Sequence, residues 1–405
     1  MKLDIIHVYI MFGGKEMTKR LGIMLFSFMM IFTMIQPVLA EENEQSSIPL
    51  AEEVPSAVLI EQSTGTILFD KNAHEPLPPA SMTKVMTLLL IMEALDEGTM
   101  KLDEMVRISE HASSMGGSQV FLAEGEEMSV EDLIKAIAIA SGNDASVALA
   151  ERIAGTEEQF VDQMNAKAQD LGLEHTQFKN ASGLPAEDQY STAHDLAMIS
   201  KELLRYEDIT NYTSIYEDYL RKGEENEFWL VNTNKLVRFY PGADGLKTGY
   251  TREAKYGLSA TANKDDMRII AVVMGAETVK KRNATITEMF DYAYSQYATT
   301  TLFEKGEKVQ SLQLMDAKNK EIDVVTSEAI RTLHGKGDTE GAYDFSIVLN
   351  ETNTLPIHKG SEIGTLHIKK NDETVRTSPL TVAEDIEKAS YYSLLKRSIQ
   401  QIIKN

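Results

Sequence analysis

The chain has 405 residues, of which 43% are hydrophobic and 25% charged, a composition typical of a globular protein with a sizeable core. Its formal net charge of −22 excludes the extended basic surface that nucleic-acid binding needs, so we expect no nucleic-acid partner. The absence of cysteine excludes disulfide bonds and thiolate catalysis. The length allows about two or three domains.

Residues 1–40 have the pattern of a secretory signal peptide. Basic residues precede the apolar stretch 21–35, small residues lead up to Ala40, and the acidic run "EENEQ" follows. This order predicts cleavage after Ala40, with either Met1 or Met17 as the start of translation. An uncleaved anchor helix is the alternative. We therefore expect the protein to be exported.

The next segments predict a linker, a hairpin and a buried helix. Residues 41–55 have the composition of a polar linker. Residues 56–73 contain two apolar runs around the turn Ser63–Gly65, which is typical of a β-hairpin. Residues 82–95 are apolar on nearly every face, which indicates a helix in the middle of a domain.

The pattern then changes from helices to strands and back. Residues 130–220 carry helical patterns, 256–276 form a strand pair with a turn at 263–266, and 278–298 predict a closing helix. Strands thus stand at both ends of 56–298. The simplest compact arrangement is an α/β (α+β) fold, in which an antiparallel sheet pairs its two ends and carries an inserted helical lobe.

The last hundred residues have a different hydropathy pattern. From about Leu302 apolar and polar residues alternate, as in 365–380 around Asn371 and Asp372, and this predicts a small β domain over 302–380. The segment 390–405 predicts an amphipathic helix. Such a helix either lies in a membrane interface or docks on the protein itself, and its spacing favours neither.

One short polar pair opens the buried helix. Ser81 and Lys84 are three residues apart, so on a helix they point along one face. A serine hydroxyl is a poor nucleophile until a base takes its proton, and a neutral lysine amine can do so when burial and a second cation lower its pKa. The pair alone is weak evidence, because Ser393 and Lys396 in the tail repeat it. That second pair fits a solvated helix face.

Two further motifs follow in order. Ser141 and Asn143, in Ser-Gly-Asn, follow an apolar helix pattern, and Lys247 and Thr248, in Lys-Thr-Gly, precede a strand. Each of these two motifs occurs once in the chain. Three such motifs in this order are the signature of penicillin-interacting serine enzymes.

On these residues the chain resembles the low-molecular-mass penicillin-binding proteins that act as serine-type D-alanyl-D-alanine carboxypeptidases. The segments "PASMTKVMT", "SGNDASVALAE", "FKNASGLPAEDQYSTAHDLA", "ADGLKTGYT" and "MRIIAVVMGAET" share this resemblance. It covers 50–298 strongly and the rest more loosely. It implies a β-lactamase/transpeptidase-like catalytic domain over 50–298, a small β domain over 302–380, and a membrane-anchor helix over 382–405 on the outer face of the cytoplasmic membrane.

The resemblance also implies roles for individual residues. Ser81 is expected to attack the carbonyl between two D-alanines of a peptidoglycan stem peptide, with Lys84 as its base, and β-lactam antibiotics are expected as covalent inhibitors. Ser141 would relay the proton to the leaving amine, and Asn143 would orient Lys84 and the substrate amide. The oxyanion hole would use the backbone N–H groups of Ser81 and Tyr250.

The third motif is expected to recognise the leaving D-alanine. By the same resemblance, Lys247 supplies positive potential, Thr248 donates a hydrogen bond to the terminal carboxylate, and Arg282 lies near that carboxylate. Some family members have a histidine at the position of Tyr250, which leaves a side-chain role for this residue open. No cofactor and no metal are implied.

Four alternatives remain. A serine β-lactamase shares the motifs, but the segment 175–191 lacks the Glu-x-x-Leu-Asn pattern of class A deacylation. A zinc peptidase lacks support, because no paired histidine spacing occurs. A crosslink-cleaving D,D-endopeptidase would share the active site, and a non-catalytic β-lactam-sensing or wall-binding module would share the fold. His194 and Asp195 suggest a triad less well than a helix start capped by Ser191 or Thr192.

Overall fold

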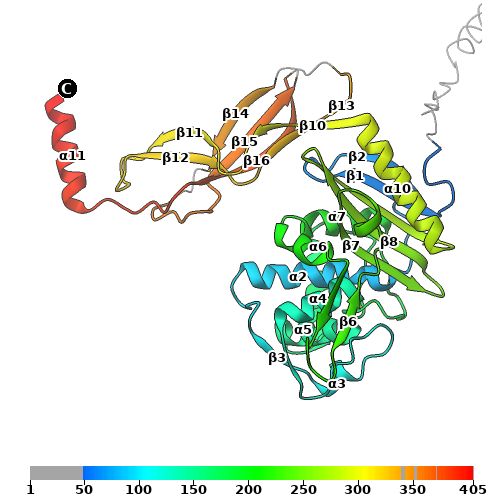
Figure 1. Ribbon diagram of the computed structural model, residues 1–405. Helices are drawn as coiled ribbons and strands as arrows, with labels where there is room; N and C mark the ends of the chain where they lie inside the picture. The colour runs from blue at the N-terminus through cyan, green and yellow to red at the C-terminus, as the bar shows by residue number, and fades with distance from the viewer. Residues whose placement is uncertain (1–48, 339–342, 351–353, 371, 405) are drawn as a thin grey trace, which may run out of the picture. The chain divides into compact units, whose positions relative to one another are not determined.

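The computed structural model describes residues 49–338, 343–350, 354–370 and 372–404 (Figure 1). The predicted signal peptide, residues 1–40, lies outside the described residues. Within the described part of the chain, no helix is both long and apolar enough to cross a membrane.

The central sheet has five antiparallel strands in the order β2-β1-β9-β8-β7. Its strands are β1 (Ser56–Glu61), β2 (Ile67–Lys71), β7 (Ala243–Thr251), β8 (Lys255–Lys264) and β9 (Met267–Ala276). The first strand of this region pairs with its last, with Leu59 opposite Ala271. The prediction of a sheet whose ends pair is therefore confirmed.

Alternate side chains of the sheet pack into two separate hydrophobic cores, one on each face. Val58 and Ile60 of β1 belong to a core with the helical lobe, whereas Leu59 belongs to a second core with Ile286 and Phe290 of α10 (Val279–Gln296). Successive side chains on a strand point to opposite faces, so a sheet covered on both sides needs apolar residues at every position. This explains the continuous apolar run of β1.

The helical lobe is formed by the residues between β2 and β7 in the sequence (Figure 1). Its longer helices are α2 (Lys84–Asp96), α4 (Val130–Ala140), α5 (Asn143–Ala154), α6 (Glu157–Asp170) and α7 (Ala193–Leu203). Shorter elements are η1 (Ala80–Thr83), α3 (Glu110–Ser113), η2 (Glu207–Ile209), α8 (Thr210–Thr213), α9 (Leu236–Phe239), β3 (Met105–Arg107) with β4 (Glu127–Ser129), and β5 (Glu217–Leu220) with β6 (Phe228–Val231).

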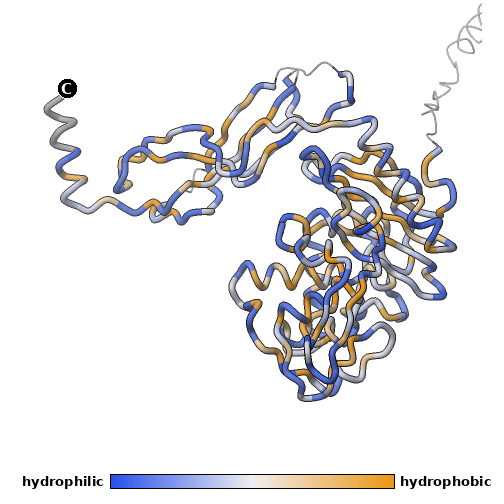
Figure 2. The backbone as a smooth tube through the Cα atoms, viewed as in Figure 1, coloured by the Kyte–Doolittle hydropathy of each residue, from blue (hydrophilic) through white to orange (hydrophobic). Residues whose placement is uncertain are grey.

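Helix α2 runs through the middle of this lobe and is hydrophobic along most of its length (Figure 2). It buries ten of its thirteen residues, including Lys84. A helix that is apolar on all faces is stable only when it is surrounded by protein. The sequence prediction of a buried helix over 82–95 is confirmed, and it begins after one turn of 3₁₀ helix, η1.

Two sequence expectations were wrong. The supposed linker 41–55 is part of the core at its described end, because Leu50, Ala51 and Val54 are buried against the second face of the sheet. The Lys-Thr-Gly motif lies inside strand β7 instead of before a strand, because pairing with β8 extends back to Ala243.

From Tyr297 onward the described residues form strands and one helix. β10 (Tyr297–Phe303) pairs with β13 (Ile330–Gly335). A five-stranded sheet follows the order β11-β12-β16-β15-β14, formed by β11 (Lys308–Gln313), β12 (Glu321–Thr326), β14 (Asp344–Leu349), β15 (Gly364–Lys370) and β16 (Glu373–Val382). The alternating segment 365–380, from which the small β domain was predicted, lies in the β15–β16 pair.

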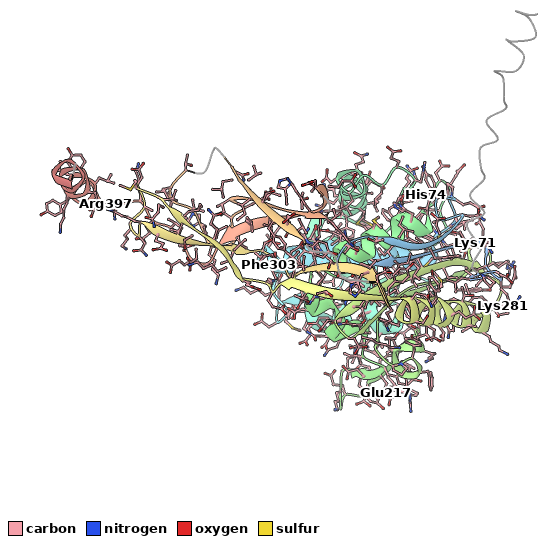
Figure 3. All side chains as sticks on the ribbon, turned by 90° about the horizontal axis from the view of Figure 1, so that it is seen from above. Lys71, His74, Glu217, Lys281, Phe303 and Arg397 are labelled. Carbon is pink, nitrogen blue, oxygen red and sulfur yellow. The ribbon has the colours of Figure 1, made fainter. Side chains whose placement is uncertain are left out.

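The final helix is α11 (Tyr391–Lys404). Arg397, labelled in Figure 3, donates hydrogen bonds to the carbonyl oxygens of Met315, Ala317 and Lys318 in the loop between β11 and β12. Tyr391 is 82% exposed. The described first half of this helix thus combines a tethered cation with an exposed aromatic side chain.

Candidate active site

The turn η1 presents Ser81 at the edge of the sheet. Ser81 lies in this 3₁₀ turn, and Lys84 is the first residue of α2, so their side chains meet with 3.3 Å between Ser81 Oγ and Lys84 Nζ. The turn packs against β7, because a Cβ atom added to Gly249 would lie 2.8 Å from the Pro79 carbonyl oxygen. Only glycine permits this close approach of the strand to the turn.

Lys84 is fully buried and contacts three oxygen atoms. Its Nζ donates to Asn143 Oδ1 at 2.6 Å and to the Ser182 carbonyl oxygen at 2.5 Å, in addition to the contact with Ser81. A neutral amine has two N–H groups and one lone pair. Two carbonyl-type acceptors use both N–H groups, so the lone pair is left to face the Ser81 hydroxyl.

The environment of Lys84 favours this neutral form. Burial, followed by the positive charge of Lys247, lowers the pKa of Lys84 well below its usual range, against a weaker opposing effect of Asp144. Desolvation and a like charge both disfavour a protonated amine. Both effects favour the neutral amine that a general base requires.

Ser141 and Asn143 lie between two helices. Ser141 ends α4 in the left-handed conformation, with φ 65°, and Asn143 begins α5. Asn143 Nδ2 donates to the Gly116 carbonyl oxygen at 2.7 Å, which fixes its amide so that Oδ1 faces Lys84. Within the described residues, no hydrogen bond joins the Ser141 hydroxyl to Ser81 or Lys84. The structure thus brings Asn143, but not the Ser141 hydroxyl, into direct contact with the pair.

The third motif supplies two buried polar groups from β7. Lys247 is fully buried, and its Nζ donates to the Thr248 carbonyl oxygen at 3.1 Å. Burial, with a further contribution from the charge of Arg282, lowers the pKa of Lys247 to about 7. Arg282, on α10, is itself buried, and this lowers its pKa to about 10. Arg282 donates from Nε and Nη2 to Asn283 Oδ1 at 3.0 and 2.9 Å.

Positive charge is therefore concentrated in this part of the site. The charge of Arg282 acts on Lys247, and neither residue forms an ion pair with a carboxylate within 4.0 Å among the described residues. Buried cations without a counter-ion are costly, and an anionic ligand removes that cost. The arrangement is suited to binding a carboxylate.

Tyr250 follows the motif on β7 and is half exposed. Its ring stacks on that of Tyr256, directly opposite on β8, with 4.4 Å between ring centroids. Its backbone follows Gly249, the residue that packs on the Ser81 turn, so the backbone of Tyr250 lies close to that turn.

Sequence reasoning missed the loop at residues 180–183. Its Ser182 carbonyl oxygen is the second acceptor for Lys84, and Asn180 Oδ1 fixes the loop by accepting from the Gly183 N–H at 2.6 Å. Gly183 has φ +81°, and a Cβ atom there would lie 1.9 Å from the Ala80 carbonyl oxygen. The residues "NASGL" belong to a segment that shares the family resemblance. The role of the Ser182 carbonyl could not be predicted from them, because every residue has a backbone carbonyl.

His194 and Asp195 form no catalytic triad with a serine nucleophile. Thr192 caps α7 by accepting from the Asp195 N–H at 3.0 Å, which confirms the helix-start interpretation. The His194 ring lies against the His74 ring, tilted by 33° with 4.4 Å between centroids, and approaches Asp195 Oδ1 at 3.0 Å. Across the described ranges, no group of three or more histidine, aspartate or glutamate residues is arranged to hold a metal ion.

The sequence matches two protein families. Residues 42–278 match the family described as D-alanyl-D-alanine carboxypeptidase, and residues 297–388 match the C-terminal domain of penicillin-binding protein 5. A curated Bacillus subtilis protein named D-alanyl-D-alanine carboxypeptidase DacF is 51% identical over 381 residues, which cover 94% of this chain and 98% of that protein.

Solved structures are similar in fold. Penicillin-binding protein 5 from Haemophilus influenzae aligns with a TM-score of 0.64 and 29% identity, covering 83% of this chain and 98% of that one. Penicillin-binding protein D2 from Listeria monocytogenes, in an ampicillin-bound form, aligns with a TM-score of 0.55 and 30% identity, covering 61% of this chain and 99% of that one.

Proposed function

The chain belongs to the D-alanyl-D-alanine carboxypeptidase family of serine peptidases, and on that premise we propose that it removes the terminal D-alanine from peptidoglycan stem peptides through an acyl-enzyme on Ser81. The observation that carries this proposal is the position of Lys84, which is buried. Its Nζ donates to two carbonyl-type oxygens and lies 3.3 Å from Ser81 Oγ. A lysine in this state is able to accept the serine proton.

In the first step Lys84 Nζ takes the hydroxyl proton while Ser81 Oγ attacks the carbonyl carbon between the two D-alanines. The backbone N–H groups of Ser81 and Tyr250 stabilise the negative oxygen of the tetrahedral intermediate. The proton then passes to the nitrogen of the leaving D-alanine, and the Ser141 hydroxyl is proposed as its relay in the substrate complex, because among the described residues of the free protein no hydrogen bond joins it to Lys84. The C–N bond breaks and an ester to Ser81 remains.

In the second step water attacks this ester and releases the shortened peptide. Lys84 accepts one proton of the water, and the Ser81 oxygen recovers a proton as it leaves. The charge and hydrogen-bond donors of Lys247, Thr248 and Arg282 act before these steps, because they bind the carboxylate of the terminal D-alanine. This carboxylate distinguishes a carboxypeptidase substrate from an internal peptide bond.

Penicillin follows the same first step, because its β-lactam carbonyl and its carboxylate match the two groups of the substrate. The ring-opened product stays attached to the serine and occupies the leaving-group side. Its slow hydrolysis is expected, since the segment 175–191 lacks the glutamate pattern of class A β-lactamases.

The cellular location is part of the proposal. The signal pattern of residues 1–40 supports export, and the apolar spacing of 390–405 with its cations supports attachment to the outer face of the cytoplasmic membrane. Deletion of residues 390–405, which keeps the buried Val382 and Ile386 of the β domain, should leave hydrolysis of a soluble peptide unchanged and abolish co-sedimentation with anionic vesicles. Persistent sedimentation of the truncated protein would contradict the anchor.

The experiment that tests the activity is D-alanine release from a peptide ending in Lys-D-Ala-D-Ala, using residues 41–405. We expect release that prior treatment with penicillin blocks. Covalent binding of penicillin without any release would instead favour a sensing module or an endopeptidase, and rapid destruction of penicillin would favour a β-lactamase.

A further inference from the structure

A second hydroxyl lies beside Thr248. Thr248 Oγ1 donates to Thr233 Oγ1 at 2.7 Å, although the two residues are fifteen positions apart. Thr233 lies in the segment 232–234, between β6 and α9, and is half-buried. No sequence motif pointed to this residue.

The segment around Thr233 is tied to both elements that carry the second and third motifs. The Thr233 N–H donates to the Ile139 carbonyl oxygen of α4 at 3.1 Å, two residues before Ser141. Asn234 Nδ2 donates to the Gly245 carbonyl oxygen of β7 at 2.9 Å, two residues before Lys247. These bonds hold the backbone of the segment in place, and the hydrogen bond from Thr248 orients the Thr233 hydroxyl, so the entropy cost of using it for a ligand is lowered.

The hydroxyl proton of Thr233 has no acceptor among the described residues. Its oxygen accepts the proton of Thr248, so its own proton is free for a ligand. A carboxylate is a pure acceptor, and a hydroxyl that donates to it forms a charge-assisted hydrogen bond. The neighbouring cations Lys247 and Arg282 favour the same ligand.

We propose that Thr233 is a second hydroxyl donor to the terminal carboxylate of the substrate, beside Thr248, and therefore a specificity-determining residue. This rests on the proposed function. The oxygens of the two hydroxyl groups are 2.7 Å apart. Either both O–H groups donate to the carboxylate, which replaces the bond between them, or Thr248 donates to Thr233 and Thr233 donates to the carboxylate. A chain of this kind polarises both bonds. A substrate without the carboxylate gains nothing from Thr233.

The test compares two acyl-D-alanine thioesters that differ only in whether the leaving thiol carries a carboxylate. Thr233→Val removes the hydroxyl and keeps the side-chain shape, Thr233→Ser keeps the hydroxyl, and Thr301→Val is a matched control on β10. We expect Thr233→Val to lower kcat/KM for the carboxylate thioester by about 10- to 100-fold, chiefly through KM. The neutral thioester should change by less than about twofold, because it makes no such bond.

Thr233→Ser should restore most of the selectivity, and Thr301→Val should behave as wild type. Equal losses on both thioesters would overturn the proposal, since they would indicate a structural role, and unchanged selectivity in Thr233→Val would overturn it as well. Failure of the proposed function has a different signature, because the wild type would then hydrolyse neither thioester.

Discussion

The Ser-x-x-Lys pattern occurs at the head of α2 and again in α11, and the two copies have opposite surroundings. Lys84 is fully buried between Asn143 Oδ1 and the Ser182 carbonyl oxygen, next to Ser81. Ser393 exchanges a hydrogen bond with Ser390 at 2.9 Å, and Lys396 is exposed. The Ser-x-x-Lys spacing brings the serine and lysine side chains onto one face in both copies. Only burial and the two acceptors of the first copy favour a lysine amine that can act as a base.

Alanine substitution of Ser81 and of Ser393 should show the largest difference between the buried and the exposed pair. Ser81→Ala should lower D-alanine release by at least about 10⁴-fold, because no other group supplies the nucleophile. Ser393→Ala, the matched control, should retain wild-type turnover. Thermal unfolding of both variants checks that the fold is intact. Comparable losses in the two variants would contradict the distinction between the buried and the exposed pair.

The acceptor loop is the next test, because only the first pair has one. Gly183→Ala places a Cβ atom 1.9 Å from the Ala80 carbonyl oxygen and strains a residue with φ +81°. We expect a loss of about 3 kcal/mol in the free energy of unfolding, with a parallel loss of acylation as the Ser182 carbonyl moves.

The matched control for this loop is Gly172→Ala. Gly172 also has a positive φ, +71°, but has open space around it, so the substitution should cost only about 1 kcal/mol. Urea unfolding with a fluorescent-penicillin acylation assay measures both effects. If both glycine variants were equally stable and equally active, the loop would not support Lys84 in the way described.

The pH dependence of kcat/KM tests the roles of the two buried lysines, Lys84 and Lys247. Lys84 acts while neutral, so kcat/KM should rise with pH through its lowered pKa. Lys247 acts while charged, and its pKa of about 7 means that its attraction for a carboxylate falls as pH rises through that value. We therefore expect a bell-shaped profile whose falling limb begins near pH 7. In Lys247→Gln the plateau should be lower and this limb absent, whereas a limb that persists in the variant would assign it to another group.

The smallest effect is expected in the tail. Ser390 Oγ accepts from the Ser393 N–H at 3.3 Å at the start of α11, which is a helix cap. Ser390→Ala should therefore weaken this helix by about 0.5–1 kcal/mol, seen as faster amide exchange within residues 391–397, without changing D-alanine release. Reduced turnover in this variant would link the tail to the catalytic site.

Much of this arrangement could be predicted from the sequence where the signal is local. The pairing of β1 with β9 followed from strand patterns at both ends of 56–298, and the buried α2 followed from apolar residues on all its faces. Burial at 50–54 was not predicted, because three apolar residues, interrupted by Glu52 and Glu53, are too few to distinguish this segment from a polar linker. Short apolar segments become core only when a sheet face lies beside them.

The same division holds for the site. Lys84 and Asn143 could be named because their motifs are compact in sequence, yet their contact spans 59 positions. The Ser182 carbonyl could not be named, because every residue has one. The Thr233 hydroxyl could not be named either, because threonine is common and its position beside Thr248 depends on how β6, α9 and β7 fold together.

The most direct measurement of the central claim is the mass-spectrometric identification of the residue that penicillin acylates in the intact protein, residues 41–405. The predicted result is a single adduct on the peptide that contains Ser81, and none on the peptide that contains Ser393. Acylation of Ser393 or of any other residue while Ser81 stays unmodified would contradict the claim that the buried Lys84 and its two acceptors create the nucleophile.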